Sequence, residues 1–208
     1  MRKLFAGISI FILASCGVVK HATITKDDYM QGKETAEGVF VVTSDGVKHS
    51  GTKIKFPPRY FQTSEYIEID GTRYGDKKKS NILAYQSENM YMAYIPAMKE
   101  HQPRIRKGKI NLYFYYNTLN STYADGRSSI TTYLRFIIEK EKSQFVFISY
   151  DNLETAFSDN AVVLQKYHEL YPDKKSADKV FTRNTNLTRN EYETLKNLKL
   201  LIDMYNGS

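Results

Sequence analysis

The segment Lys109-Ile110-Asn111-Leu112-Tyr113-Phe114-Tyr115-Tyr116-Asn117 carries the strongest strand pattern in the chain. Every second residue is large and apolar: Ile110, Leu112, Phe114 and Tyr116. The residues between them form a more polar face: Lys109, Asn111, Tyr113 and Tyr115. A period of two predicts a β-strand that buries one face against a core.

The same period continues after this strand. A polar loop through Asp125-Gly126 leads to an alternating segment over Ile130–Ile138, and Gln144–Tyr150 follows as a further strand. We expect residues 139–143 to form the turn between those two segments. Three successive strands of this kind predict an antiparallel meander with one face toward the core.

Several shorter strands are predicted on the N-terminal side. Asp45-Gly46 lies between apolar runs and indicates a tight hairpin turn, because such turns need positive φ angles. The strands are expected at 39–43, 47–56, 65–70, 82–86 and 89–95. Residues 97–107 are basic and contain Pro103, so they are predicted to form a loop.

Beyond Tyr150 the apolar spacing becomes helical. Helix starts are expected at three capping positions: Asp151 or Asn152, Ser158 or Asp159, and the capping box Thr188–Glu191. The polar residues 173–186 are predicted to form a loop, with a short strand at 179–181. Strands followed by helices predict an α+β fold, in which C-terminal helices pack on a mainly antiparallel, meander- or sandwich-like β-sheet within one domain over residues 38–208.

The N-terminus has the layout of a secretory signal peptide. Basic Arg2 and Lys3 precede the apolar run 4–13, and the small residues Ala14 and Ser15 stand directly before Cys16, the only cysteine. The apolar run is about ten residues long, whereas a helix that crosses a bilayer needs roughly 20. An ordinary signal peptide that is cut elsewhere is the alternative.

The stretch Leu13-Ala14-Ser15-Cys16 resembles the lipobox of bacterial lipoproteins. The resemblance implies that residues 1–15 are removed and that Cys16 carries fatty acyl chains such as palmitate. Residues 16–37 are then a flexible, lipid-anchored stalk, which fits their polar composition. By resemblance to lipoprotein sorting signals, Gly17 in place of Asp after the cysteine implies an outer-membrane rather than an inner-membrane anchor. The lack of an acidic cluster over residues 17–21 implies that the protein faces the periplasm. The lipid on Cys16 would therefore attach the chain to the membrane.

Charge and cysteine content limit the partners. The formal net charge is +7, which suggests acidic partners such as anionic lipids or glycans, although a mixed surface with some excess lysine is the simpler interpretation. Export argues against nucleic acid. A single cysteine excludes an internal disulfide, so burial must hold the fold together.

No catalytic or metal-binding motif is recognisable. The four histidines lie far apart, and no zinc spacing, phosphate loop or nucleophile motif occurs. Ser158-Asp159-Asn160 and Ser176–Lys179 match elements of penicillin-recognising enzymes in reversed order, which we attribute to chance. No cofactor or metal is therefore expected. One alternative stays open, an envelope glycan or peptide hydrolase that uses Glu68 and Asp70 as its carboxylates.

Tyrosine is the one feature that suggests binding. The chain has 17 tyrosines and no tryptophan. Tyr113, Tyr115, Tyr133 and Arg135 lie on the more polar faces of two strands expected to be neighbours. If that face is open, it predicts a site for a sugar or a peptide. The alternative, which we favour from the sequence, is that the C-terminal helices cover this face.

Residues 38–206 resemble a domain of unknown function found in exported Bacteroidota proteins. The matching segments are Gly38-Val39-Phe40-Val41 with Asp45-Gly46, Lys107–Tyr113, and Ile202-Asp203-Met204-Tyr205-Asn206. The resemblance implies a β-rich domain with C-terminal helices and assigns no catalytic residue. With the lipobox, it favours a membrane-anchored envelope lipoprotein without enzymatic activity, which binds or scaffolds an envelope protein or glycan.

Overall fold

The computed structural model describes residues 38–56, 66–75, 81–87, 90–122, 124–126, 128–141, 144–181 and 189–208. Within them, an 8-stranded antiparallel sheet and a 3-stranded sheet are followed by helices, which confirms the α+β class. The predictions for residues 1–37, and for Thr188 as a cap, lie outside the described residues.

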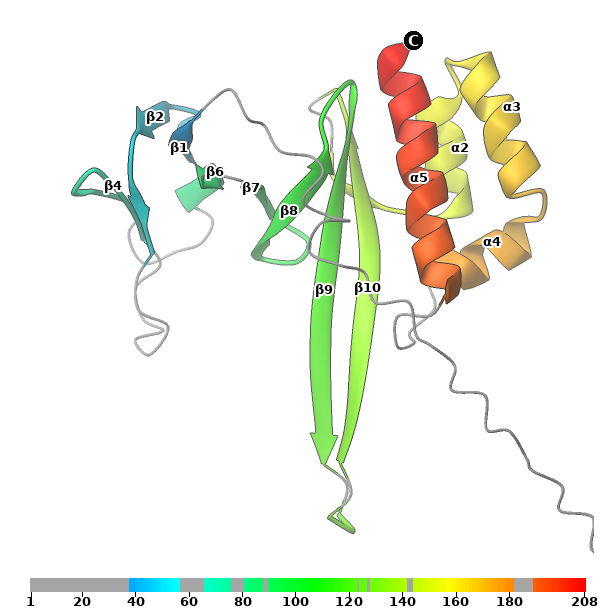
Figure 1. The fold of residues 1–208 in the computed structure, drawn as a ribbon, viewed down its shortest axis with the longest axis horizontal. Coiled ribbons are helices and arrows are strands. Elements are labelled where there is room, and N and C mark those ends of the chain that lie inside the picture. The colour runs from blue at the N-terminus through cyan, green and yellow to red at the C-terminus, as the bar shows by residue number, and fades with distance from the viewer. Residues whose placement is uncertain are drawn as a thin grey trace, which may run out of the picture.

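The elements follow one another along the chain as Figure 1 shows. The large sheet contains β1 (Val39–Thr43), β2 (Lys48–Gly51), β6 (Ile82–Ser87), β7 (Met90–Ile95), β8 (Glu100–Arg106), β9 (Ile110–Thr122), β10 (Ser128–Lys140) and β11 (Val146–Phe147). The small sheet contains β3 (Ile54–Lys55), β4 (Ile67–Ile69) and β5 (Thr72–Tyr74). The helices are α2 (Tyr150–Phe157), α3 (Ala161–Leu170), α4 (Lys174–Phe181) and α5 (Arg189–Gly207).

The large sheet is the meander that the sequence predicts. Its strand order is β11-β10-β9-β8-β7-β6-β1-β2, so six consecutive strands pair with their neighbours in the chain. β9 and β10 are longer than expected, with 13 residues each, and pair along their whole length. The predicted hairpin at Asp45-Gly46 is also confirmed, because β1 pairs with β2 and Gly46 has a φ of 80°.

The main core lies between one face of β8–β10 and the helices. Leu112 pairs with Ile138 and Phe114 pairs with Phe136, so these apolar side chains share a face. The buried helix residues that pack in the same cluster include Leu153, Phe157, Tyr167, Leu198, Leu201, Ile202 and Tyr205. Figure 1 shows the helices together on one side of the β9–β10 hairpin. The helices therefore cover the apolar face that contains Leu112, which offers the larger apolar area.

The expectation that the helices cover the tyrosine face is thus wrong. Tyr113 belongs to a second cluster on the opposite face, together with Ala93, Ile95 and Ile137. Its ring is buried by other strands of the sheet and by Phe145, and not by helices. At Leu112 and Tyr113, β9 is consequently covered on both faces, by helices on one and by the Tyr113 cluster on the other.

Two elements were not expected. The first is β8, which replaces the predicted loop and contains Pro103 opposite Met92 of β7. β8 pairs with β9 only at Arg104 and Arg106. The β8–β9 pairing therefore needs no amide hydrogen from Pro103. A strand can therefore tolerate proline here, although it has a neighbour on each side.

The second is α4, which replaces the loop and the short strand predicted after Asp173. The Asp173 carboxylate accepts a hydrogen bond from the Ser176 backbone N–H at 2.7 Å, as a helix cap does. Ala177 and Phe181, four residues apart, are the buried face of this helix. The sequence contains this spacing, but the surrounding lysines make the segment polar overall, which favoured the interpretation as a loop.

The helix caps also differ from those predicted. Ser149 caps α2, where Asp151 or Asn152 was expected, and Asn160 caps α3, where Ser158 or Asp159 was expected. Each cap side chain accepts a hydrogen bond from the backbone three residues ahead, so the helices begin within a few residues of the predicted positions.

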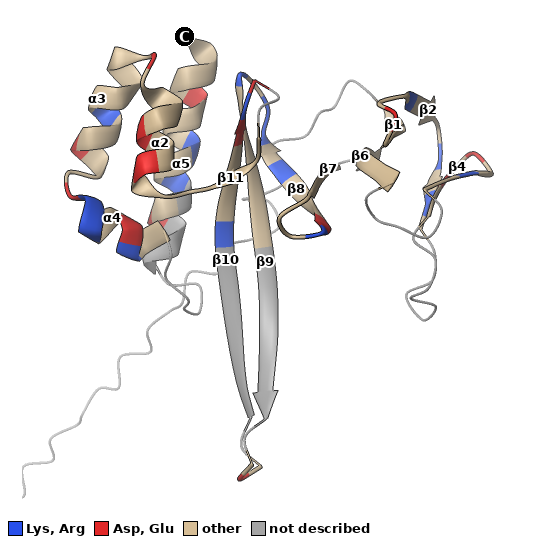
Figure 2. Cartoon of the chain, turned by 180° about the vertical axis from the view of Figure 1, so that it is seen from behind, with Lys and Arg blue, Asp and Glu red and all other residues tan. Residues whose placement is uncertain are grey.

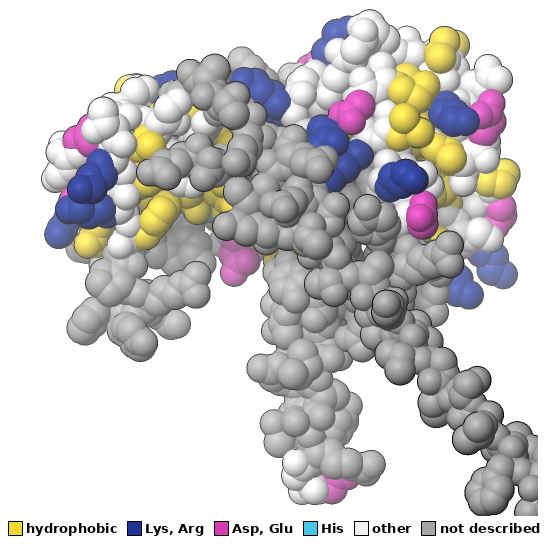
Figure 3. All heavy atoms as spheres, in the orientation of Figure 1, with side chains coloured by type: hydrophobic (Ala, Val, Ile, Leu, Met, Phe, Trp, Pro, Cys, Tyr) yellow, Lys and Arg dark blue, Asp and Glu magenta, His cyan; other side chains and the backbone are white. Residues whose placement is uncertain are grey.

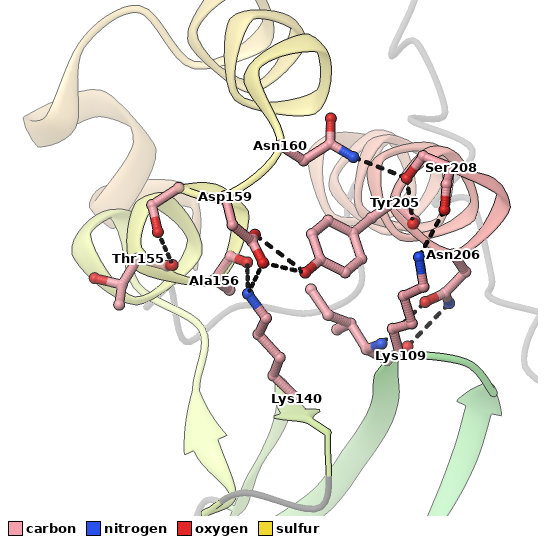
Figure 4. Close-up of polar contacts among 11 residues, drawn as sticks. Lys109, Lys140, Thr155, Ala156, Asp159, Asn160, Tyr205, Asn206 and Ser208 are labelled. Carbon is pink, nitrogen blue, oxygen red and sulfur yellow. Dashed lines mark hydrogen bonds and ion pairs between the residues drawn. The ribbon is translucent and has the colours of Figure 1, made fainter.

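The end of α5 is attached to the β8–β9 corner, as Figure 4 shows. The Asn206 side chain accepts a hydrogen bond from Ile110 N–H at 2.9 Å and donates to Ile110 C=O at 3.0 Å. A Cβ atom on Gly108 would overlap this amide, so glycine permits the close approach. Asn206 therefore replaces a neighbouring strand for Ile110, which is fully buried.

A second set of polar contacts connects α5 to β10 through the loop before α3. Asp159 accepts hydrogen bonds from Lys140 Nζ at 2.9 Å and from Tyr205 Oη at 2.9 Å. The pKa of the Asp159 carboxyl lies below its ordinary value, mainly because Lys140 and Tyr205 donate to the charged form. This cluster holds the helices on the sheet, and its Ser158-Asp159-Asn160 sequence is explained by caps and packing.

Candidate functional site

A cavity of about 670 Å³ opens on the tyrosine face of the large sheet. Its lining includes residues of β6, β7, β8, β9 and β10, so several strands of the meander contribute to one concave surface. The volume lies within the range of small-molecule sites, roughly 300–1,000 Å³. We take this cavity as the candidate binding site.

Small residues create part of the space. Ala84 of β6 and Ala93 of β7 are directly opposite each other and both line the cavity. The short side chains leave room above these strands that larger neighbours enclose. Tyr91 and Phe145 supply aromatic walls.

A buried polar cluster lies on the β9–β10 side. Glu139 Oε2 accepts hydrogen bonds from Asn111 Nδ2 at 2.9 Å and from the Tyr113 hydroxyl at 2.8 Å. Asn111 Oδ1 accepts from Gly108 N–H at 3.2 Å and from Arg104 Nη1 at 3.4 Å. These partners orient the Asn111 amide, because its oxygen faces donors and its nitrogen faces a carboxylate.

Arg104 completes the cluster from β8. Its guanidinium lies 3.7 Å from the centre of the Tyr91 ring, a cation–π contact. Burial lowers the pKa of Arg104, while Tyr113 and the Glu139 carboxylate oppose that shift. Arginine keeps its charge even so, because its ordinary pKa lies far above neutrality.

Tyr113 is held as a neutral hydroxyl. Its side chain is 1% exposed, and burial raises the pKa of Tyr113 well above its ordinary range, with Glu139 adding to the effect. The hydroxyl therefore keeps its proton and donates a hydrogen bond to Glu139. This arrangement suits a fixed binding surface, whereas a general base would need a pKa closer to neutrality.

The structure places the four residues predicted from the sequence at different points of this face. Tyr113 lines the cavity, and Tyr115 packs against the same cluster, partly buried. Arg135 is opposite Tyr115 and exposed, with its guanidinium 5.8 Å from the centre of the Phe147 ring. Tyr133 is opposite Asn117, farther along the hairpin, and its side chain lies outside the described residues.

Sequence reasoning missed most of the cavity residues. Arg104 was assigned to a loop and Glu139 to a turn, whereas they belong to β8 and β10. Glu139 continues the alternation of Ile137, so the period of two carried a usable signal. No sequence signal could bring Tyr91 next to Arg104, because strand pairing sets that contact.

The two carboxylates of the hydrolase alternative have structural roles outside this cavity. Glu68 forms ion pairs with Lys55 at 3.1 Å and Arg73 at 3.6 Å across the small sheet. Asp70 accepts hydrogen bonds from Thr52 N–H and Lys53 N–H, each at 2.9 Å. The pKa of each lies below its ordinary value, Glu68 mainly through Lys55 and Asp70 mainly through Thr52. A general acid needs the opposite shift.

The described surface carries both signs of charge. Figure 2 shows acidic and basic residues interspersed along the helices, and ion pairs such as Lys174–Asp151 at 2.6 Å connect them. On the face shown in Figure 3, Lys and Arg side chains lie among acidic, polar and hydrophobic ones. This distribution favours the mixed-surface interpretation of the basic excess.

The described residues lack two features that would point to a function, a metal site and a membrane-spanning helix. They contain no group of three or more His, Cys, Asp or Glu residues placed to hold a metal ion. None of the helices described is both long and apolar enough to cross a membrane.

Comparison with known proteins identified no relative. No family model matches the chain, and no curated protein or solved structure was found to be similar to it. The resemblance to an exported Bacteroidota domain therefore stays a prediction. The cavity is therefore the feature of this chain that points to a function.

Proposed function

We propose that this chain is a non-enzymatic envelope lipoprotein whose β-sheet domain binds a glycan in the cavity beside Tyr113. The observation that carries the proposal is the combination of aromatic walls with a preorganised polar cluster. Aromatic rings offer flat apolar surfaces for the C–H faces of a sugar, and polar groups fix its orientation.

The polar groups match hydroxyls in particular. Arg104 can only donate hydrogen bonds, the Glu139 side chain accepts them, and Asn111 does both. Each sugar hydroxyl both donates and accepts, so a site that presents both kinds of group close together is complementary to it. A peptide would bind mainly through its backbone, whereas the lining of this cavity presents side-chain donors and acceptors.

Charge at the cavity favours a neutral ligand. Basic Arg104 and Lys107 are balanced by acidic Glu139 and Glu141 in its lining. A phosphate site would carry an excess of basic groups, and a cation site would carry an excess of carboxylates. We therefore expect a neutral sugar unit of an envelope glycan.

Binding is tested with the full chain in detergent on an array of neutral and charged oligosaccharides. We expect a neutral oligosaccharide to bind, and Tyr91→Ala and Glu139→Gln each to weaken it about tenfold or more, which corresponds to 1.4 kcal/mol. Isothermal titration then measures the dissociation constants. Glu139→Gln keeps an oxygen that can accept from Asn111 and Tyr113, so the fold should persist.

Tyr66→Ala is the matched control, because Tyr66 is a partly buried tyrosine outside the cavity, stacked on Arg73. It should leave binding unchanged. Glycan binding that survives both cavity substitutions, or an array without any neutral sugar bound, would refute the proposed site.

The anchoring part of the proposal is supported by the lipobox resemblance at Cys16. Acyl chains there would tether the domain through residues 16–37 to the outer membrane, on the side that faces the periplasm. A single acyl chain gives only marginal binding, so a stable anchor needs more than one.

Replacing Cys16 tests the anchor directly. Cys16→Ala should abolish incorporation of labelled palmitate and move the protein from the membrane fraction to the soluble fraction, because no sulfur is left to acylate. Ser15→Ala is the control, since it keeps a small residue before the cysteine. Undiminished labelling of the Cys16→Ala protein would contradict lipidation at this site.

A further inference from the structure

The outer half of the β9–β10 hairpin extends away from the rest of the domain. Figure 1 shows both strands continuing past the helices and past β8. β9 and β10 remain paired to their ends, from Lys140 opposite Ile110 to Ser128 opposite Thr122. We call residues 115–135 of this hairpin the arm.

The arm has open edges within the described part of the chain. β11 pairs with β10 only at Ile137 and Ile138, and the last bond runs from Ile148 N–H to Phe136 C=O. No described strand pairs with β10 between Ser128 and Arg135. An unpaired edge of this length is a template for another strand.

The backbone groups that face this edge follow from the ladder. Phe136 C=O points toward β11, and alternate residues of a strand direct their amides to the same side. The outward-facing residues of the arm are therefore Ser128, Ile130, Thr132 and Leu134. Their odd-numbered neighbours pair with β9, as Glu141 N–H does with Lys109 C=O at 2.8 Å.

The sequence of the arm lacks the features that normally protect such an edge. Charged residues make up 25% of the chain, yet between residues 110 and 134 only Asp125 and Arg127 are charged. The arm contains no proline or lysine. Lysine, proline or a bulge usually blocks edge-to-edge pairing, so composition leaves this edge unprotected, and no other described strand occupies it.

We propose that the β10 edge of the arm pairs antiparallel with the same edge of a second copy, so that the two copies form a two-fold symmetric dimer. A two-fold axis places identical segments opposite each other. Like charges would therefore repel across the axis. The absence of charge from 128 to 134 removes that penalty, so the same stretch of a second copy meets this edge without repulsion.

The test is sedimentation velocity of the full chain in detergent over a range of concentrations, with Thr132→Pro as the variant. We expect the native chain to dimerise and Thr132→Pro to weaken the dimer about tenfold or more, since proline removes an outward N–H on both copies. Thr132 N–H is not used in the β9 ladder, so the melting temperature should change little. Thr132→Val keeps the N–H and should dimerise normally.

Ile130→Lys is the second variant, and it keeps the test decisive if proline disturbs the arm. It places like charges near each other across the axis, and dimerisation should fall with the melting temperature preserved. A native chain that stays monomeric at every concentration overturns the proposal. So does a dimer that both variants leave intact.

Discussion

Replacing Phe157 with alanine is expected to lower the free energy of unfolding by about 3–5 kcal/mol, the usual cost of removing a large aromatic side chain from a core. Phe157 ends α2 and is 0% exposed. Its ring centre lies 5.9 Å from that of Tyr167 on α3 and 6.0 Å from that of Tyr205 on α5. The substitution would therefore leave a new void where three helices meet. Denaturant unfolding followed by circular dichroism measures the loss of stability.

Val162→Ala on the neighbouring helix is the control. Val162 is 69% exposed, so its truncation should change the free energy of unfolding by less than about 0.5 kcal/mol. If Phe157→Ala costs no more than Val162→Ala, the helices do not share the core described here. Because small domains are stable by only about 5–15 kcal/mol, the expected loss is a large part of the total.

The second large effect is expected where α5 meets the β8–β9 corner. Asn206→Ala should destabilise by about 2–3 kcal/mol, because it leaves the N–H and C=O of buried Ile110 without their partner. Gly108→Ala should cost about 1–3 kcal/mol, because the new methyl group overlaps the Asn206 amide. Thermal and denaturant unfolding of the full chain measure both.

The double variant shows whether these two effects share one cause. With Asn206 truncated, the methyl group of Gly108→Ala has space, so the two costs should sum to more than the cost of the double variant by at least about 0.5 kcal/mol. Gly207→Ala is the matched control, since a Cβ there meets nothing within 4 Å and its φ is not positive. Strictly additive costs would contradict the close approach of Gly108 and Asn206.

This corner also connects stability to the proposed function. Gly108 lines the cavity, and its N–H is one of the two donors that orient Asn111 Oδ1. A shift of Gly108 would therefore change the polar groups that face a ligand. We expect variants at this corner to weaken glycan binding as well as stability, whereas Phe157→Ala acts mainly through stability.

Much of the β-sheet could be predicted because its signal is local. The alternation over 109–117 and 130–138 specified two strands, and the polar loop through Asp125-Gly126 between them made antiparallel neighbours the natural pairing. The switch to helical spacing after Tyr150 located most of the C-terminal helices. Each prediction needed only residues that are close together in the chain.

The elements that escaped prediction depend on distant contacts. β8 contains a proline that would end most strands, and it persists because β7 pairs with it where β9 does not. α4 is rich in lysine, and its helix is stabilised by burying Ala177 and Phe181 against other elements. Tertiary packing outweighed local preference in both cases.

The sequence by itself determined the α+β class, the long central hairpin and the tyrosine-bearing face, because a period of two specifies which residues share a face. Only the tertiary structure decided which face the helices cover, since both faces offered rings or aliphatic side chains to bury. It also brought Arg104, Asn111 and Glu139 together around one cavity. Residues on three different strands become neighbours only through strand order and register, which depend on the packing of the whole sheet.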